Sequence, residues 1–205
     1  MIPNQQVNLL GIWGSNPFAG FTISEILKHS KKKTKTWVFN TLRLFVKNNI
    51  LNSERKGNLD IYRLNVDNPI SFQLLEYLEA QDTINFPQLH VISDIIEKSP
   101  FKNFSLLVFG SYAEKKSTKN SDLDLCLLIE NKDMEKKITP YLQDVKLNTT
   151  LKIDEHCITF SEFVEMLLRE EENLGKQIFR KHKLFYNADI YYQLLKEAHK
   201  HGFIP

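Results

Sequence analysis

The feature that most constrains this chain is an apolar run that stops at a glycine-serine turn. Residues 104–109 read FSLLVF and end at Gly110 and Ser111. After ten further residues, Asp122 and Asp124 open a second apolar run that continues to position 129. Short apolar runs bounded by turn residues are typical of buried strands. The pattern therefore predicts a small sheet whose strands present a glycine turn and a pair of carboxylates.

The residue types in this pattern suit phosphate and metal binding. Gly110 lets a phosphate approach the main chain, and Ser111 adds a hydroxyl donor, so the turn can cradle a polyphosphate. Asp122 and Asp124 are two residues apart on a strand, so both carboxylates project from one face. Such a pair is unfavourable unless a cation lies between the charges. Mg²⁺ prefers oxygen ligands, and two ions about 3.5–4 Å apart would clamp the attacking and leaving oxygens of a displacement.

At this point the chain resembles a known family. The segments that carry the resemblance are Gly110-Ser111-Tyr112-Ala113 and Ser121-Asp122-Leu123-Asp124-Leu125. They are similar to the signature of the nucleotidyltransferase superfamily that includes polymerase β, and above all to its minimal members in archaea and bacteria. The resemblance extends more weakly from about residue 99 to residue 198.

The resemblance implies a reaction and a set of roles. A nucleoside monophosphate, which we expect to be AMP from ATP, would pass to a hydroxyl with release of pyrophosphate. Gly110 and Ser111 would hold the triphosphate, and Asp122 and Asp124 would bind two Mg²⁺ ions. Ser121 either caps the strand or touches the nucleotide. The family often has Arg-Gly after the alanine of the turn, whereas Glu114 follows here, so this loop departs from the pattern.

The family also has a third carboxylate on a later strand, which activates the acceptor hydroxyl. The candidate strand spans residues 151–158, where alternation predicts Lys152, Asp154 and His156 on the face of the site. We therefore assign Asp154 as the third catalytic and metal-binding residue. Glu155 is the alternative, because a single bulge would exchange the two faces.

The first third of the chain has a different character. Residues 1–66 carry ten Lys or Arg and three acidic residues, a charge of +7, whereas the remainder carries −5. Helices are predicted over residues 5–13, from Thr22 to Ser30 with Glu25 completing a capping box, and from Thr34 to Asn48. A hairpin with a turn at residues 55–58 follows. This order predicts a winged helix-turn-helix.

We expect an α+β chain of two domains. Residues 1–68 form the winged helix, residues 69–87 a linker helix, and residues 88–205 a small mixed-sheet nucleotidyltransferase domain with flanking helices. The helix from Thr34 would be the recognition helix, with Lys31 and Lys32 in the basic turn before it. Its expected nucleic-acid contacts are the basic residues Lys33, Lys35, Arg43 and Lys47.

Composition excludes several other classes of protein. Two cysteines are too few for a disulfide framework and do not match a zinc motif, so we expect reduced thiols and a cytoplasmic location. The start of the chain does not resemble a signal peptide, and no apolar run is long enough to span a bilayer. The expected partners are nucleotide, DNA, a protein acceptor or toxin, and a second copy of the chain, but not a membrane.

A second function fits the same sequence. In that interpretation the winged helix binds DNA, and the second domain binds nucleotide or a partner protein without robust turnover, as in a regulator or an antitoxin. The orientation of Asp154 discriminates between the two, because catalysis requires it to face Asp122 and Asp124.

Overall fold

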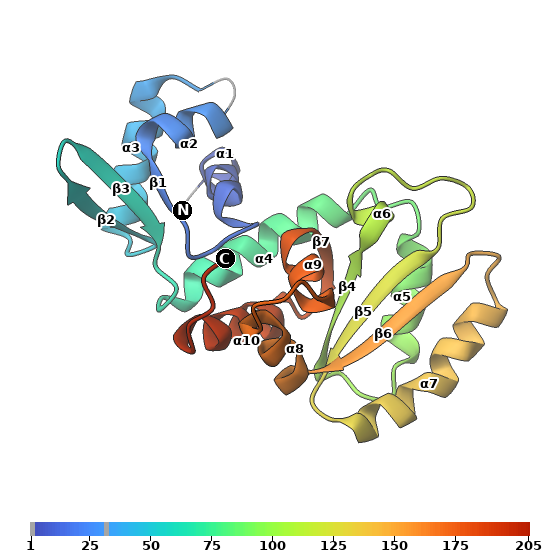
Figure 1. The fold of residues 1–205 in the computed structure, drawn as a ribbon. Helices are drawn as coiled ribbons and strands as arrows, with labels where there is room; N and C mark the ends of the chain where they lie inside the picture. The colour runs from blue at the N-terminus through green and yellow to red at the C-terminus, as the bar shows by residue number, and fades with distance from the viewer. Residues whose placement is uncertain (1–2, 31–32) are drawn as a thin grey trace. The chain divides into compact units, whose positions relative to one another are not determined.

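The computed structural model describes residues 3–30 and 33–205, and these divide into two compact units. Unit 1 comprises residues 1–78 with residue 205, and unit 2 comprises residues 79–204. Helix α4 (Pro69–Thr83) begins in unit 1 and ends in unit 2. The chain is an α+β protein, as the sequence predicts (Figure 1). Lys31 and Lys32 lie outside the described residues.

The described part of unit 1 combines short helices with a three-stranded sheet. The sheet is antiparallel in the order β1-β3-β2, and residues 57–58 form the turn between β2 and β3. Trp13, Leu42 and Phe45 are fully buried in its core. The elements are α1 (Asn4–Val7), the 3₁₀ helix η1 (Asn8–Trp13), β1 (Gly20–Thr22), α2 (Ile23–His29), α3 (Lys35–Lys47), β2 (Leu51–Lys56) and β3 (Leu59–Leu64).

Two local predictions for unit 1 are confirmed and one strand was missed. Thr22 and Glu25 form the predicted capping box at the start of α2. The hairpin pairs from Leu51 with Leu64 up to its turn, where Gly57 has a φ of +59°. Strand β1 was not predicted, because three residues are too few to show alternation, and it exists through its pairing with β3.

Unit 2 is built on a four-stranded mixed sheet in the order β6-β5-β4-β7. Strands β5 and β6 are parallel, whereas β4 is antiparallel to both of its neighbours. The strands are β4 (Phe104–Phe109), β5 (Leu123–Ile129), β6 (Ile153–Thr159) and β7 (His182–Tyr186). The helices are α5 (Leu89–Lys98), α6 (Gly110–Ala113), α7 (Lys132–Leu147), α8 (Phe160–Leu168), α9 (Leu174–Arg180) and α10 (Ala188–Lys200).

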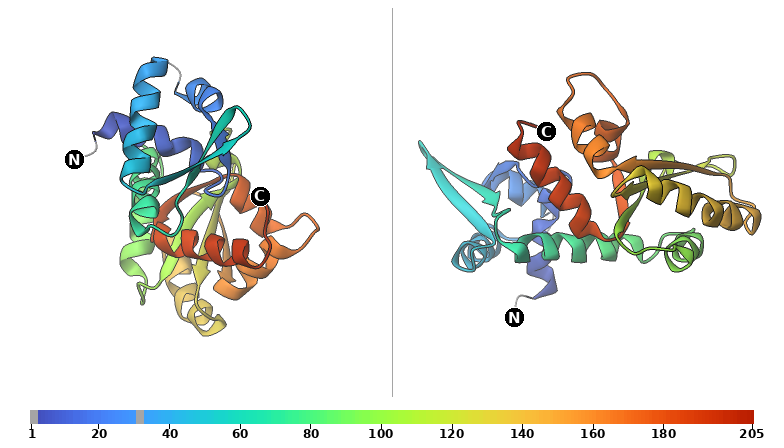
Figure 2. Two further views of the ribbon diagram at one scale, coloured as in Figure 1. Left: turned by 90° about the vertical axis from the view of Figure 1, so that its left-hand side faces the viewer. Right: turned by 90° about the horizontal axis from the view of Figure 1, so that it is seen from below.

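Helices cover both faces of this sheet (Figure 1, Figure 2). On one face, α5 and α7 pack against the apolar side of β4 and β5, where Leu123, Leu125 and Leu127 are fully buried. On the other face lie α8 and α10, whose Phe163 and Tyr191 are also fully buried. The alternation predicted for β5 is thus observed. No helix in the described part of the chain is long and apolar enough to cross a membrane.

Candidate functional site

The glycine turn at the end of β4 positions the site. Gly110 begins α6 with a φ of +63°, a backbone conformation that costs glycine little. A Cβ atom at this position would overlap the carboxylate of Asp124. Glycine therefore both turns the chain and leaves room for an acidic side chain against the main chain.

Asp124 is half-buried on β5, and several neighbouring groups shift the pKa of its carboxyl group. Burial raises the pKa of Asp124, and the negative charges of Asp154 and Asp122 raise it further. His156 and a hydrogen bond from the Ser111 backbone N–H act in the opposite direction. The carboxylates of Asp122 and Asp154 thus lie close enough to Asp124 to disfavour its ionised form.

The register of the sheet decides which of Asp154 and Glu155 lies on the same face as Asp124. Asp124 and Asp154 are directly paired residues of the parallel strands β5 and β6, so their side chains leave the same face. The carboxylate of Asp154 is exposed and lies 3.4 Å from Nε2 of His156. Glu155 instead forms an ion pair with Lys146 of α7, on the opposite face. The strand has no bulge here, and Asp154 lies on the side of Asp124.

Asp122 lies one residue before β5 and is exposed. Ser121, at the end of the same loop, accepts a hydrogen bond from the backbone N–H of Thr118 at 2.9 Å. Its hydroxyl therefore stabilises the loop that leads into the strand.

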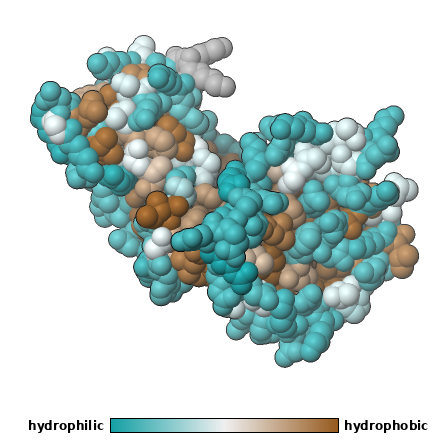
Figure 3. Space-filling model, viewed as in Figure 1, coloured by the Kyte–Doolittle hydropathy of each residue, from teal (hydrophilic) through white to brown (hydrophobic). Residues whose placement is uncertain are grey.

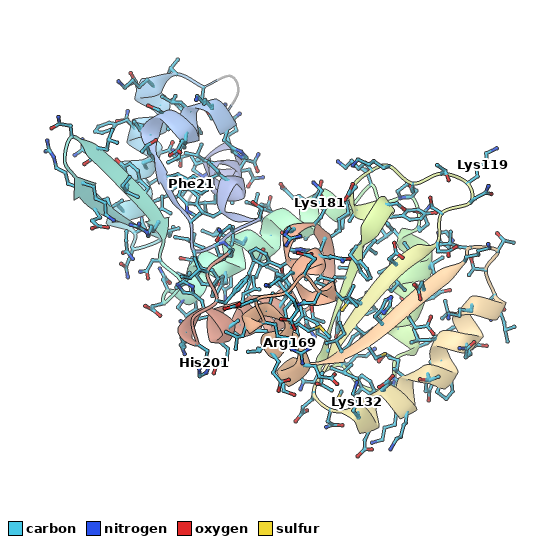
Figure 4. The ribbon with its side chains drawn as sticks, in the orientation of Figure 1. Phe21, Lys119, Lys132, Arg169, Lys181 and His201 are labelled. Atoms are coloured by element: carbon cyan, nitrogen blue, oxygen red, sulfur yellow. The ribbon has the colours of Figure 1, made fainter. Side chains whose placement is uncertain are left out.

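A cleft of about 480 Å³ opens at this turn. Phe109, Gly110, Glu114 and Asp124 line one part of it. The rest of the lining comes from the end of α9 and the residue after it, namely Gln177, Arg180 and Lys181. Figure 4 shows Lys181 where α9 passes into β7. In the view of Figure 3 the surface around α6 and the loop after it is hydrophilic or neutral rather than apolar.

The cleft residues of α9 were not predicted from the sequence. Arg180 donates to Glu172 with an Nη1–Oε1 distance of 2.8 Å. His156, which the sequence places on the face of the site without a role in it, contacts Asp154 and lies against the ring of Phe109, with 5.6 Å between ring centroids. Helix α9 has only seven residues, too few to show a helical period in the sequence, and its approach to Gly110 is a tertiary contact.

A comparison with known protein families gives a match for the region that contains this site. Residues 91–191 match the family model Polymerase beta, Nucleotidyltransferase. The match supports the polymerase-β-type superfamily for this domain, and it contains the four-stranded sheet, the glycine turn and all three aspartates. No curated protein and no solved structure matches the chain.

The region that matches the family model offers oxygen ligands of the kind that Mg²⁺ prefers. Asp124 and Asp154 supply carboxylates on one side of the sheet, the charge of Asp122 also acts on Asp124, and a cation would relieve this repulsion. Within residues 3–30 and 33–205, no group of three or more His, Cys, Asp or Glu side chains is arranged so that it could hold a metal ion. The three carboxylates suit the ion by their chemistry, but the described residues do not bring them together as a formed metal site.

The predicted nucleic-acid residues lie on or beside α3 of unit 1. Lys35, Arg43 and Lys47 are exposed and recur at multiples of four residues, so they share one side of the helix. The guanidinium of Arg43 lies 5.8 Å from the ring centroid of Phe39, which is 40 % exposed. Lys33 precedes the helix, and its Nζ donates to Oε1 of Gln5 at 3.0 Å. Three of the four predicted cations therefore form one basic strip.

Proposed function

We propose that the chain is a metal-dependent nucleotidyltransferase that moves a nucleoside monophosphate, AMP from ATP, to a hydroxyl acceptor. The observation that carries the proposal is the pairing of Asp124 with Asp154 beside Gly110. A glycine turn next to a cluster of carboxylates is an arrangement for binding a nucleotide together with cations. The family match of residues 91–191 supports the same reaction class.

Each residue has a stated task in this reaction. The oxygen of the acceptor hydroxyl attacks the α-phosphorus, and the bond from that phosphorus to the β-phosphate oxygen breaks, so that pyrophosphate leaves. Asp154 accepts the hydroxyl proton. The Gly110–Ser111 turn orients the triphosphate, and Asp122, Asp124 and Asp154 would hold Mg²⁺. The bound metal would supply Lewis-acid stabilisation of the phosphate oxygens.

The test follows the transferred group. The purified protein is incubated with Mg²⁺ and each of the four nucleoside triphosphates, labelled at the α-phosphate, in the presence and absence of proteins that co-purify with it. We expect label from ATP on a protein or nucleic-acid hydroxyl and release of unlabelled pyrophosphate. Label that never leaves the nucleotide under any of these conditions would overturn the proposal.

We propose a second role for unit 1, as a winged helix that binds DNA. The basic strip on α3 and the hairpin β2–β3 support it, because helix and wing are the two elements that such a module places on a duplex. If the nucleotidyltransferase domain binds nucleotide or a toxin without turnover, the chain would act as a regulator or antitoxin, with a second copy of itself as a further candidate partner. Tight DNA binding with no label transfer would favour that role over catalysis.

A further inference from the structure

The wall of the cleft that comes from α9 carries positive charge. The charged side chains lining the cleft are two carboxylates, Glu114 and Asp124, and two cations, Arg180 and Lys181. The cations come from the end of a helix far along the chain, whereas the carboxylates lie beside the glycine turn. Cations are favoured at the carboxyl end of a helix, because the backbone carbonyls there carry partial negative charge.

The two cations differ in how they are held. The guanidinium of Arg180 is engaged with Glu172, and this pair is exposed. The charge of Lys181 acts on Glu114, whose pKa is lowered chiefly by its hydrogen bond and charge interaction with Lys116 and to a smaller extent by Lys181. Glu114 and Lys116 lie 2.6 Å apart. Lys116 therefore takes most of the interaction with Glu114, and the ammonium of Lys181 remains available to a stronger anion in the cleft.

A nucleoside triphosphate needs such a charge in this cleft. It carries several negative charges and must approach Asp122, Asp124 and Asp154, which repel it. Bound metal would offset part of that repulsion at the carboxylates. The remaining phosphate oxygens need donors on another wall, and a lysine ammonium is a compact point charge suited to this task.

We propose that Lys181 binds the polyphosphate of the nucleoside triphosphate, with Arg180 as a secondary contact that must first be released from Glu172. This inference rests on the proposed function and assigns the donors that the glycine-turn motif does not contain. It makes the end of α9 part of the nucleotide site. It also makes Glu172 a residue that restrains binding, although Glu172 does not line the cleft.

The experiment compares binding of a non-hydrolysable ATP analogue with binding of adenosine, by calorimetry in the presence of Mg²⁺. We expect Lys181→Ala to weaken analogue binding about tenfold, as removal of a charge-assisted contact does, and to leave adenosine binding unchanged. Lys181→Arg should restore most of the affinity. The matched control is Lys176→Ala on the same helix, because Lys176 donates to the backbone carbonyl of Glu170 and does not line the cleft.

Glu172→Gln provides a second test with the opposite sign. It releases Arg180 without removing a cation, so analogue binding should tighten by a few fold, whereas a merely structural pair would weaken binding when broken. Thermal melts establish that each variant is folded. Equal binding by wild type and Lys181→Ala, or equal losses in the variants at positions 176 and 181, would overturn this inference alone. Failure of the wild type to bind any triphosphate would overturn the proposed function itself.

Discussion

Helix α3 of unit 1 and the paired strands β5 and β6 of unit 2 both present charged residues on one side and apolar residues on the other. On α3 the cations Lys35, Arg43 and Lys47 are exposed and lie in water, so each is tolerated at little cost. On β5 and β6, Asp124 and Asp154 occupy paired positions, and Asp124 is half-buried. A basic strip on a helix is therefore weak evidence of function, whereas clustered carboxylates are strong evidence.

The physical reason is the free energy of the charged state. The raised pKa of Asp124 means that its ionised form is disfavoured in the folded chain, first by burial and then by neighbouring carboxylates. An amide or an apolar residue at position 124 would remove this unfavourable free energy, so a carboxylate there needs a functional reason. Arrangements of this kind are concentrated at binding and catalytic sites.

The largest expected effect comes from removing the aspartate pair. Asp122→Asn with Asp124→Asn should reduce label transfer by roughly a thousandfold or more, because the groups act as a unit. The fold should persist, since two like charges are removed and the side chains keep their size. The measurement is the rate of label transfer, beside the affinity of the same variant for DNA.

A matched variant replaces two exposed acids elsewhere in the unit, Asp94→Asn with Asp189→Asn, and should transfer label at the wild-type rate. If the variant of the aspartate pair lost DNA binding as well as transfer, the pair would be a structural element and the contrast with α3 would fail.

The next effect separates two adjacent acids on β6. Asp154→Asn should lower the transfer rate by about 10²–10⁴-fold, the range for loss of a general base. Glu155→Gln should leave the rate within about twofold, because Glu155 pairs with Lys146 on the other face. The measurement is kcat at saturating ATP, with circular dichroism to show that both variants are folded. A larger loss from the Glu155 variant would reverse the assignment.

Much of this site could be predicted from the sequence, because its central part is local. The turn at Gly110 and the alternation around Asp124 lie within one short segment, and period and residue type are sufficient to place them. The choice of Asp154 over Glu155 depended on an unbulged strand. Its register with β5 is a tertiary property that the sequence could only leave open.

What the sequence did not predict is formed by contacts between distant segments. Strand β7 is an edge strand of five residues beginning with His182 and Lys183, and it lacks a clear alternation. Helix α9 is short, so Lys181, the residue after it, carries no local sign that it lines the same cleft as Gly110. Single-sequence patterns reveal elements that bury a regular face, and they miss elements that are ordered by their neighbours.

A half-buried acid outside the cleft, Glu79, sharpens the comparison. Burial raises the pKa of Glu79 to about 7, although the hydroxyl of Tyr192 donates to its Oε1 at 3.2 Å. The folded state therefore holds this proton more tightly than the unfolded chain, so its stabilising effect is complete below pH 4.5 and is lost as the pH rises through 7. Glu79→Gln keeps an acceptor for Tyr192 and removes the titration.

We expect Glu79→Gln to raise the free energy of unfolding of unit 2 by about 2–3 kcal/mol at pH 8 and by little at pH 4.5, since one pKa unit corresponds to about 1.4 kcal/mol. Urea denaturation at both pH values measures this. Glu97→Gln, at an exposed position of α5, is the control and should show no such dependence. Unchanged label transfer in the Glu79 variant would show that an acid whose ionisation is unfavourable can be purely structural when it lies outside the cleft. A raised pKa would then indicate function only where several acids cluster.

The smallest expected effect concerns α3. Arg43→Gln with Lys47→Gln should weaken DNA binding roughly tenfold and reduce the slope of log K against log salt by about 2, because each phosphate contact contributes close to one unit. The charge-matched control is Lys136→Gln with Lys137→Gln on α7, which are exposed in the other unit. Equal losses in both variants would mean that only net charge matters. In that case the basic strip on α3 is an ordinary solvated helix face without a binding role, and only the carboxylates of β5 and β6 form a functional site.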